Sequence, residues 1–226
     1  MKYSKETVKK AVTSLRDAIR TARMTPEKAK LHISKGNRKI GMVHNFSVAP
    51  VITCANCSGC KDFCYDIKAV IQYKNVLKAR AENTALMLED MAGTFEKIAD
   101  YIRRRQVHKY FRWHVAGDII NYEYFCHMVD IARMFPEWTF WTYTKAYHIV
   151  NLWLYQNGRL PENLTVMFSV WNGMECPNPH NMPTFTCIQE GMEPDPDAWS
   201  CPGNCSICIE SGHGCPHGES SQVNEH

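Results

Sequence analysis

The spacing of apolar residues predicts a helix at the start of the chain. Apolar side chains recur every three or four positions over about residues 4 to 24, between lysines and arginines. This spacing places them on one face of an amphipathic helix. We expect the helix to end before Thr25-Pro26, since the residue before a proline rarely continues a helix. The apolar positions are Val8, Val12, Leu15, Ala18 and Ile19.

Strands and helices are then predicted to alternate. A β-rich stretch begins near residue 39, and we expect a strand that ends at Thr53. An order in which helices separate the strands favours parallel strands joined by right-handed helical crossovers. The predicted fold class is therefore α/β, with a parallel sheet or a partial (β/α) barrel. Further strands are expected at 110–115, 139–142 and 164–170, and helices at 66–90, 95–102, 121–134 and 145–156.

Three segments of the chain differ in composition. Residues 1–38 form a basic helical arm, residues 39–173 an α/β core, and residues 174–226 an acidic tail rich in Cys, His and Pro. Seven of the 11 prolines lie in the tail, which shows no apolar periodicity. We therefore expect the tail to be a loop-rich cap whose folding energy comes from metal coordination.

The overall composition is that of a globular protein. With 45% hydrophobic and 22% charged residues among 226, disorder, collagen and coiled coil are excluded. No apolar run approaches the roughly 20 residues of a membrane span, and the first 24 residues lack the apolar centre of a signal peptide. The expected location is the cytoplasm, where thiols stay reduced. The 11 cysteines therefore point to metal binding rather than to disulfides.

The charge distribution makes nucleic acid a possible binding partner, while no membrane contact is expected. Residues 1–40 carry 12 Lys and Arg against three Asp and Glu. A basic arm of this kind can contact a phosphate backbone, and the 12 aromatic residues between Tyr110 and Tyr147 would then stack on bases. The simpler interpretation is a solvated helix face and an aromatic core.

The most specific motif is a run of four cysteines, here called the loop cysteines: Cys54, Cys57, Cys60 and Cys64. Structural zinc sites usually separate two C-x2-C pairs by a dozen or more residues, whereas this run spans 11. The spacing matches the bacterial ferredoxin pattern, in which the fourth cysteine can ligate another cluster. The run therefore predicts a [4Fe-4S] cluster, with a zinc knuckle as the alternative.

A second group lies in the tail and is here called the tail cysteines: Cys201, Cys205, Cys208 and Cys215. Four thiolates suit either a cubane cluster or zinc, so the chain is expected to hold one or two clusters, with zinc as the alternative in the tail. Cys176, Cys187 or His213 could replace one of the four ligands.

Polar residues stand at the ends of successive predicted strands. Ligands of parallel α/β folds bind at the carboxyl ends of the strands, and Cys54 begins the loop after the first one. We therefore expect one pocket beside the loop cysteines. The catalytic candidates are Arg112, His114, Asp118, Tyr143 and Lys145, and the cofactor-binding candidates are Ser169 and Asn172.

These motifs together resemble a phage and mobile-element family called gene product eighty-eight-like. The resemblance covers about residues 40 to 218 and includes Gly59-Cys60-x3-Cys64-Tyr65, Arg112-x-His114-x2-Gly117-Asp118 and Tyr143-Thr144-Lys145. It implies a phage or prophage protein in the host cytoplasm, an iron-sulfur site, and a relation to radical S-adenosylmethionine proteins. It further suggests that Arg112, His114, Asp118, Tyr143 and Lys145 are functional, but it supplies no reaction.

Three functions follow from these expectations. If three loop cysteines hold a cluster with one open iron, the protein is a radical S-adenosylmethionine-like enzyme with an unknown substrate and an electron donor as partner. If all four cysteines ligate one cubane, no iron is open and the protein is an electron carrier or cluster-binding module. The remaining alternative is a metal-stabilised nucleic-acid binder without enzymatic activity.

Overall fold

An eight-stranded sheet forms the centre of the structure, a computed structural model that describes residues 2–224. The strands are β1 Ile33–Ser34, β2 His44–Phe46, β3 Tyr110–Trp113, β4 Thr139–Thr144, β5 Leu164–Val170, β6 Thr184–Ile188, β7 Trp199–Ser200 and β8 Ser221–Asn224. Across the sheet they follow the order β1-β2-β3-β4-β5-β6-β8-β7. β1 and β2 are antiparallel and all other neighbours are parallel, so the predicted α/β class with a mostly parallel sheet is confirmed.

Seven α-helices and three short 3-10 helices connect these strands in the described residues. The α-helices are α1 Lys5–Met24, α2 Tyr65–Gln72, α3 Lys74–Glu89, α4 Met91–Arg103, α5 Tyr122–Met134, α6 Tyr147–Asn157 and α7 Cys205–Ser211. The 3-10 helices are η1 Pro26–Lys28, η2 Lys61–Phe63 and η3 Cys215–His217. None of the described helices combines the length and the apolar character that a bilayer crossing requires.

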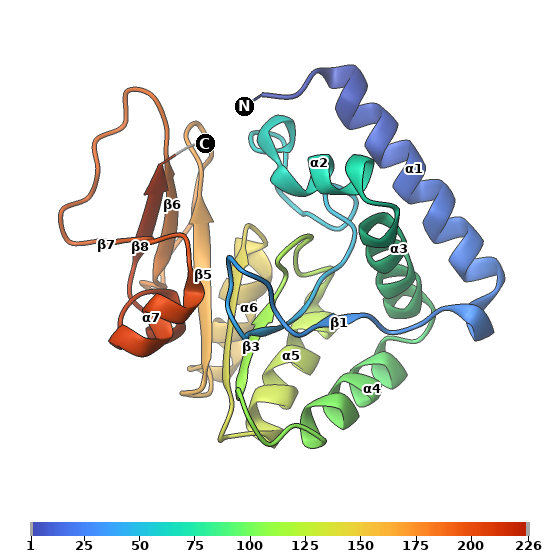
Figure 1. Ribbon diagram of the computed structural model, residues 1–226. Helices are drawn as coiled ribbons and strands as arrows, with labels where there is room; N and C mark the ends of the chain where they lie inside the picture. The colour runs from blue at the N-terminus through green and yellow to red at the C-terminus, as the bar shows by residue number, and fades with distance from the viewer. Residues whose placement is uncertain (1, 225–226) are drawn as a thin grey trace.

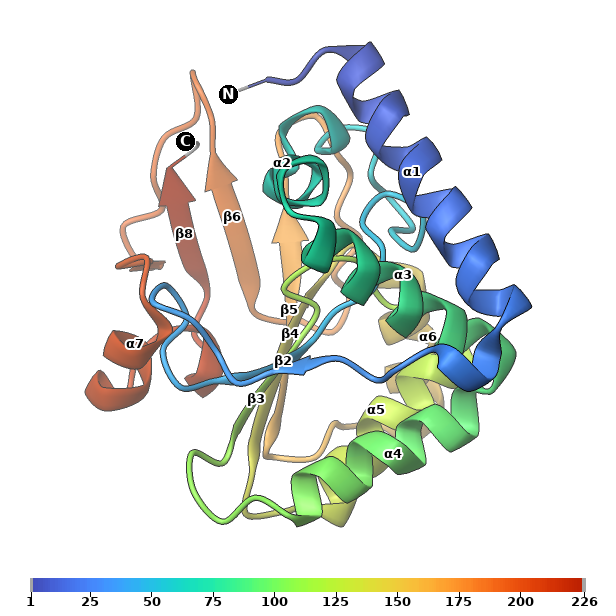
Figure 2. The same ribbon diagram turned by 45° about the vertical axis from the view of Figure 1, so that its right-hand side comes forward.

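The two faces of the sheet are buried by different parts of the chain. Helices α4, α5 and α6 cover one face, where Phe111 and Trp113 of β3 join the largest apolar cluster (Figure 2). The opposite face buries Trp141 of β4 and Met167 of β5 against Cys215 in the tail. The central strands are therefore buried on both faces, as is usual for parallel sheets.

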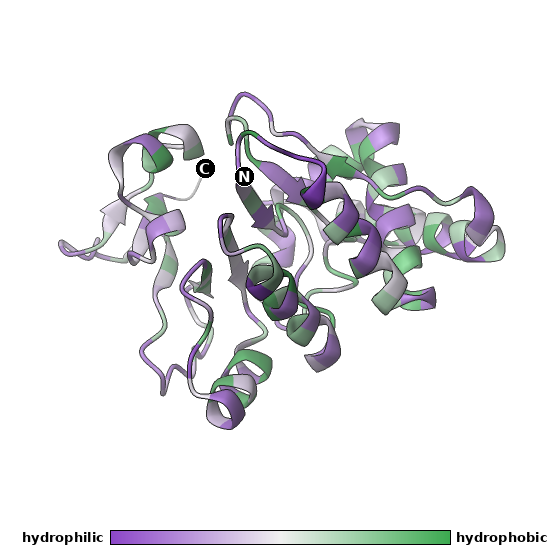
Figure 3. Cartoon of the chain, turned by 90° about the horizontal axis from the view of Figure 1, so that it is seen from below, coloured by the Kyte–Doolittle hydropathy of each residue, from purple (hydrophilic) through white to green (hydrophobic). Residues whose placement is uncertain are grey.

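Helix α1 packs against α3, on the side of the molecule away from the tail strands (Figure 1). Its residues Leu15 and Ile19 are buried with Ala81 and Ala85 of α3. Both hydrophilic and hydrophobic positions occur around the turns of the helices (Figure 3). The predicted amphipathic helix is therefore confirmed: its basic side chains are exposed, and one of them, Arg23, pairs with Glu89 at the end of α3.

Three sequence-based expectations about local structure are wrong in whole or in part. The strand expected to end at Thr53 stops at Phe46, and residues 50–53 form a turn in which Val51 has a φ of 67°. The helix expected over residues 66–90 breaks at Tyr73 into α2 and α3. The tail is loop-rich, as expected, but it is not a separate cap, because β6, β7 and β8 extend the central sheet. These short strands pair through backbone hydrogen bonds and therefore need no apolar run.

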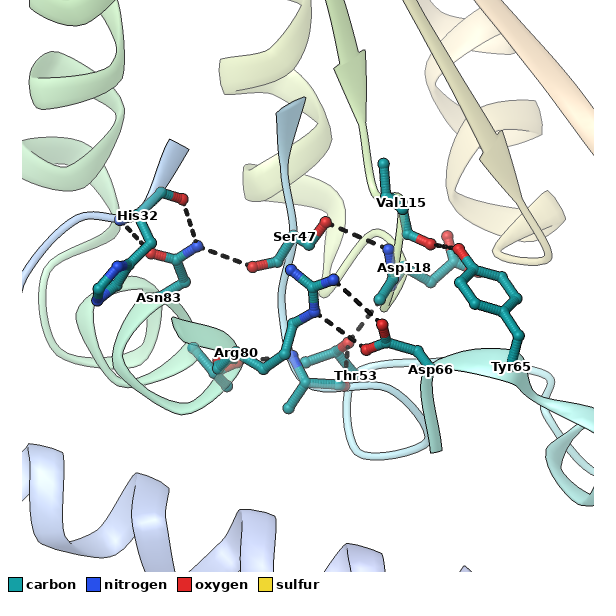
Figure 4. Close-up of polar contacts among 12 residues, drawn as sticks. His32, Ser47, Thr53, Tyr65, Asp66, Arg80, Asn83, Val115 and Asp118 are labelled. Atoms are coloured by element: carbon teal, nitrogen blue, oxygen red, sulfur yellow. Dashed lines mark hydrogen bonds and ion pairs between the residues drawn. The ribbon is translucent and has the colours of Figure 1, made fainter. Parts of the chain in front are cut away.

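A buried amide joins α3 to the first two strands. Asn83 is 1% exposed. Its Oδ1 accepts a hydrogen bond from the backbone N–H of His32 at 2.8 Å, and its Nδ2 donates to the carbonyls of His32 and Ser47, each at 2.9 Å (Figure 4). One side chain therefore satisfies three backbone groups at the edge of the sheet.

Replacement of this amide should be costly. Asn83→Ala leaves these backbone groups without their partner and should lower the free energy of unfolding by about 2–4 kcal/mol. The matched control is Asn75→Ala, at an exposed position of the same helix, which should change it by less than about 0.5 kcal/mol. Urea unfolding followed by circular dichroism measures both, and equal midpoints for the two variants would contradict the assignment.

Candidate functional site

The loop that carries the loop cysteines is fixed onto the carboxyl ends of β3 and β4. Asn56 Nδ2 donates to the carbonyl of Lys145 at 2.7 Å, directly after β4. The Tyr65 hydroxyl donates to the carbonyl of Val115, after β3, and the N–H of Asp118 donates to Thr53 Oγ1 at 3.3 Å (Figure 4). The loop therefore lies at the sheet edge where parallel α/β proteins bind ligands.

The four loop cysteines lie close enough to affect one another electrostatically. Burial and then the neighbouring Asp118, Cys64 and Cys57 raise the pKa of Cys54 well above its usual value. Burial also raises the pKa of Cys57, with a further contribution from Cys60. Burial also raises the pKa of Cys64 to about 11, and the charge of Cys60 contributes to this shift. The run therefore forms one group of thiols.

Cys64 differs from Cys54 in its surroundings. It is the N-cap residue of α2, and the backbone N–H groups of Asp66 and Ile67 lower the pKa of its thiol against the effect of burial. Amide groups at a helix N-terminus favour a negatively charged sulfur. A carboxylate opposes the thiolate form at both positions, Asp66 at Cys64 and Asp118 at Cys54.

Asp118 is a buried connection between β3 and β4. Its carboxylate accepts hydrogen bonds from Thr144 Oγ1 at 2.6 Å, from the N–H of Lys145 at 2.9 Å and from the N–H of Ile119 at 2.7 Å. Burial raises its pKa, while these three hydrogen bonds act in the opposite direction. Because both oxygens already have partners, Asp118 is placed to position the loop and the end of β4.

Lys145 and Ser169 lie together beside the loop cysteines. Lys145 Nζ donates to Ser169 Oγ at 2.9 Å, and the positive charge of Lys145 lowers the pKa of Cys57 against burial. Asn172 lies further along, after β5, where its backbone N–H donates to Gln189 Oε1 at 3.1 Å. Of the predicted pocket residues, the structure thus brings Asp118, Lys145 and Ser169 to the loop.

The structure places His114 in the core instead. It is 3% exposed, and its ring nitrogens lie 3.0 Å from Thr142 Oγ1 and 2.9 Å from the Tyr124 hydroxyl. Burial, with a smaller contribution from the charge of Arg112, lowers its pKa to about 3. Both nitrogens are therefore occupied in a neutral ring, which is the arrangement of a structural histidine.

Arg112 and Tyr143 turn to the opposite face of the sheet, toward the tail. The Arg112 guanidinium lies over the Tyr143 ring, with 4.6 Å from Cζ to the ring centroid. Burial lowers the pKa of Arg112, but Tyr143, Tyr65, Cys205 and Cys215 more than offset this and raise it above its usual value. The two residues therefore belong to the surroundings of the tail cysteines.

The tail cysteines also form one group. Burial raises the pKa of Cys208 to about 11, and Cys215, Cys201 and Cys205 all add to this effect. The other candidate tail ligands have different neighbours: Cys176 hydrogen-bonds with Tyr147, His213 stacks on Trp199 at 4.8 Å and contacts Glu219, and Cys187 lies in β6.

No group of three or more His, Cys, Asp or Glu side chains within residues 2–224 converges in the way that a single metal ion requires. A cavity of about 420 Å³ lies elsewhere, between α3 and the β1–β2 edge, and includes His32, Asn45 and Arg80 in its lining. Neither cysteine group lines it.

Several structurally important residues escaped the sequence analysis. Arg80 makes two hydrogen bonds to the buried Asp66, at 3.0 and 3.1 Å, directly behind the loop (Figure 4). Trp199 and Ser221 contact the tail cysteines. Arg80 and Asp66 were missed because they lie on two helices separated by a break that the apolar pattern does not reveal. Trp199 was missed because it is one aromatic residue in a polar segment.

Residues 14–199 of the chain match the protein family described as Gene product 88. The chain belongs to that family. The resemblance to a phage gene product family is thereby confirmed, although the match carries no cofactor and no reaction. A search of the curated proteins and a search of the solved structures gave no match.

In this Gene product 88 protein, Gly117 permits a close approach between the β3 end and the loop. Its φ is +80°, and an added Cβ would lie 2.4 Å from Val48 Cγ2 and 2.8 Å from the Val48 carbonyl oxygen. Gly117→Ala should therefore cost about 2–5 kcal/mol of unfolding free energy, from backbone strain and from the clash. Gly158→Ala is the matched control, because Gly158 has a φ of +86° but nothing within 4 Å. Thermal unfolding should separate the two variants; similar losses would show that only the backbone angle matters.

His114 should make the Gene product 88 fold sensitive to acid. Its pKa falls from 6.5 to about 3 on folding, so protons bind the unfolded chain preferentially between these values. The neutral ring therefore makes its full contribution to the free energy of unfolding above pH 6.5. This contribution is lost as the pH falls toward 3, by up to about 1.4 kcal/mol per pH unit. His114→Gln should flatten the dependence of unfolding free energy on pH between 7.5 and 5, whereas His148→Gln, at an exposed position, should not. A variant slope equal to that of the unmodified protein would refute this account.

Proposed function

We propose that this protein is an iron-sulfur protein of the radical S-adenosylmethionine-like type, with its cluster held by the loop cysteines. The observation that carries the proposal is the docking of the cysteine loop onto the carboxyl ends of β3 and β4, with Lys145 beside Cys57. A reactive centre in a parallel α/β fold is expected at this edge.

The donor set fits a cluster better than a single zinc ion. Tetrahedral zinc with Zn–S distances near 2.3 Å requires thiolates within about 4 Å of one another. The loop cysteines are close neighbours, and all four lie within 11 residues, which is the bacterial ferredoxin spacing rather than that of two well-separated C-x2-C pairs. In a cubane each thiolate binds a different iron, so the sulfurs do not have to converge.

The surroundings of the four thiols favour three of them as ligands. Cys64 lies at the N-terminus of α2, whose amides lower the pKa of its thiol against burial and Asp66, and Cys57 lies beside Lys61 and Lys145. Cys54 faces the Asp118 carboxylate, which disfavours its thiolate form. We therefore assign Cys57, Cys60 and Cys64 as ligands and leave Cys54 as a buried thiol, so that one iron stays open.

A bound cluster with an open iron supplies one electron for reductive cleavage of S-adenosylmethionine. The chain's own residues bind and orient that ligand. Lys145, held at its backbone by Asp118 and at its Nζ by Ser169, is placed to pair with the methionyl carboxylate. Phe63 of the loop lies beside Trp171, with ring centroids 5.5 Å apart, and Trp171 also approaches Gly59, so these two rings would limit the access of water.

The nucleic-acid alternative receives less support from the structure. Its stacking residues are largely unavailable, since Trp113, Trp138, Trp141 and Phe140 are each no more than 1% exposed. The basic face of α1 is solvated, and two of its arginines pair with acids: Arg20 with Asp17 and Arg23 with Glu89.

Single serine substitutions test the cluster assignment. Anaerobically purified protein should be brown, with broad absorbance near ~400 nm. Cys57→Ser, Cys60→Ser and Cys64→Ser should each lose this absorbance and the corresponding iron and sulfide, because a ligand is removed. Cys54→Ser should retain them, as should the control Cys126→Ser in α5, which lies outside both cysteine groups.

The same preparations decide between the functions. Reduced protein and its Cys54→Ser variant should cleave S-adenosylmethionine to 5′-deoxyadenosine. Loss of the cluster in Cys54→Ser, with no cleavage by the intact protein, would indicate a closed four-cysteine cluster and an electron carrier. A colourless protein containing only zinc would overturn the proposal entirely.

A further inference from the structure

The tail cysteines are surrounded by hydrogen-bond donors rather than by acids. Arg112 lowers the pKa of Cys205 through its charge and through a hydrogen bond, against the effect of burial. Tyr143 and Ser221 do the same for Cys215 by hydrogen bonding, again against burial. Each of these groups stabilises a negatively charged sulfur. Burial nevertheless leaves the pKa of Cys205, Cys208 and Cys215 above its usual value, so thiolates here need a further positive charge beside them.

Trp199 adds a further donor on the other side of the group. Its indole Nε1 is buried without a hydrogen-bond partner among the described residues, and it lies beside Cys208, whose pKa it lowers. Gly214 permits this approach, because an added Cβ would lie 3.1 Å from Cys208 Sγ and 3.1 Å from Trp199 Nε1. The backbone here leaves room for the indole and the thiol together.

Arg112 is the unusual member of this set. No ion pair of residues 2–224 includes it, and its Nε is a buried donor without a partner in the same part of the chain. The groups that raise its pKa are two tyrosines, Tyr143 and Tyr65, and two thiols, Cys205 and Cys215. A buried cation without a carboxylate is costly unless another negative charge stands beside it.

We propose that Cys201, Cys205, Cys208 and Cys215 hold a second, anionic metal centre, and that Arg112, Tyr143 and Trp199 form its hydrogen-bonding shell, with Arg112 balancing its charge. The inference rests on the proposal that the cysteine groups bind metal. Four thiolates around zinc or around an oxidised cubane leave about two net negative charges in either case. The need for Arg112 is therefore the same for both metals, and Arg112 and Tyr143 are positioning residues of the tail centre rather than catalytic residues at the loop.

The tail cysteines lie against the central sheet, so side chains of its strands can contact them. Cys215 packs with Trp141 and Met167 on the inner face of β4 and β5, where Tyr143 and the Phe185 ring also lie, with centroids 4.8 Å apart. Outer donors of this kind fix metal ligands and tune their basicity, and their loss typically weakens metal binding by about 10- to 100-fold.

The test compares metal release from matched arginine variants. Arg112→Met removes the charge and the donors, whereas Arg112→Lys keeps the charge without the planar fork. The control is Arg105→Met: Arg105 likewise lies over a tyrosine ring, at 4.4 Å from Tyr101, and likewise has a buried Nε without a partner in the described chain, but its charge acts on His44 rather than on a cysteine. Tyr143→Phe removes one donor only.

The tail centre is first defined as the iron or zinc lost in Cys205→Ser/Cys208→Ser relative to the unmodified protein. Under a chelator, Arg112→Met should release this metal about 10- to 100-fold faster, with Arg112→Lys and Tyr143→Phe intermediate and Arg105→Met unchanged. If the metal is iron, Arg112→Met should also lower the midpoint potential of the centre, since a positive charge that favours reduction is removed.

Circular dichroism shows whether each variant is folded. If Arg112→Met does not fold, Arg112→Lys is compared with Arg105→Met instead. Unchanged metal content in Cys205→Ser/Cys208→Ser would overturn the inference, as would equal release rates for Arg112→Met, Arg112→Lys and Arg105→Met. Failure of the loop cluster is distinguishable, because it would appear as unchanged iron in Cys57→Ser while the tail metal still depends on Cys205 and Cys208.

Discussion

The carboxylate of Asp118 is the contact on which the arrangement of the candidate site depends. It is 5% exposed and accepts hydrogen bonds from Thr144, Lys145 and Ile119, while its own N–H reaches Thr53 in the cysteine loop. A buried carboxylate is tolerated because these donors replace the water that it loses. One residue thereby fixes the distance between the loop and the end of β4, and it places the Lys145 side chain beside the thiols.

The sheet separates two kinds of chemistry on its two faces. The face toward α4, α5 and α6 is an aromatic core in which His114 is neutral and satisfied. The other face carries Arg112 and Tyr143 and is closed by the tail. Because successive strand residues alternate between faces, residues adjacent in sequence, such as Arg112 and Trp113, serve different sites.

This alternation also explains what could be predicted from the sequence. Helix α1 and strands β3, β4 and β5 follow from apolar spacing, and strand β5 agrees with its expected bounds of 164–170. The tail strands could not be predicted from apolar spacing, because they are held by backbone pairing and by a few half-buried side chains. The strand ends identified a shared sheet edge, but not which side of the sheet each residue faces. Lys145 and Ser169 meet beside the loop, whereas His114 and Tyr143 lie on opposite faces.

The position of β8 has a consequence for the order in which the chain can assemble. β8 lies between β6 and β7, although it follows both along the chain, and within residues 2–224 it is the only strand that pairs with β7. During synthesis on the ribosome, β1 to β6 can add to the sheet one after another. β7 must wait for β8 to emerge and insert, whereas α7 is also held by a hydrogen bond from the N–H of Cys205 to the carbonyl of Lys39. Cys215 follows the other tail cysteines and all four loop cysteines along the chain, so the set of four tail thiols is complete only after the loop thiols have emerged.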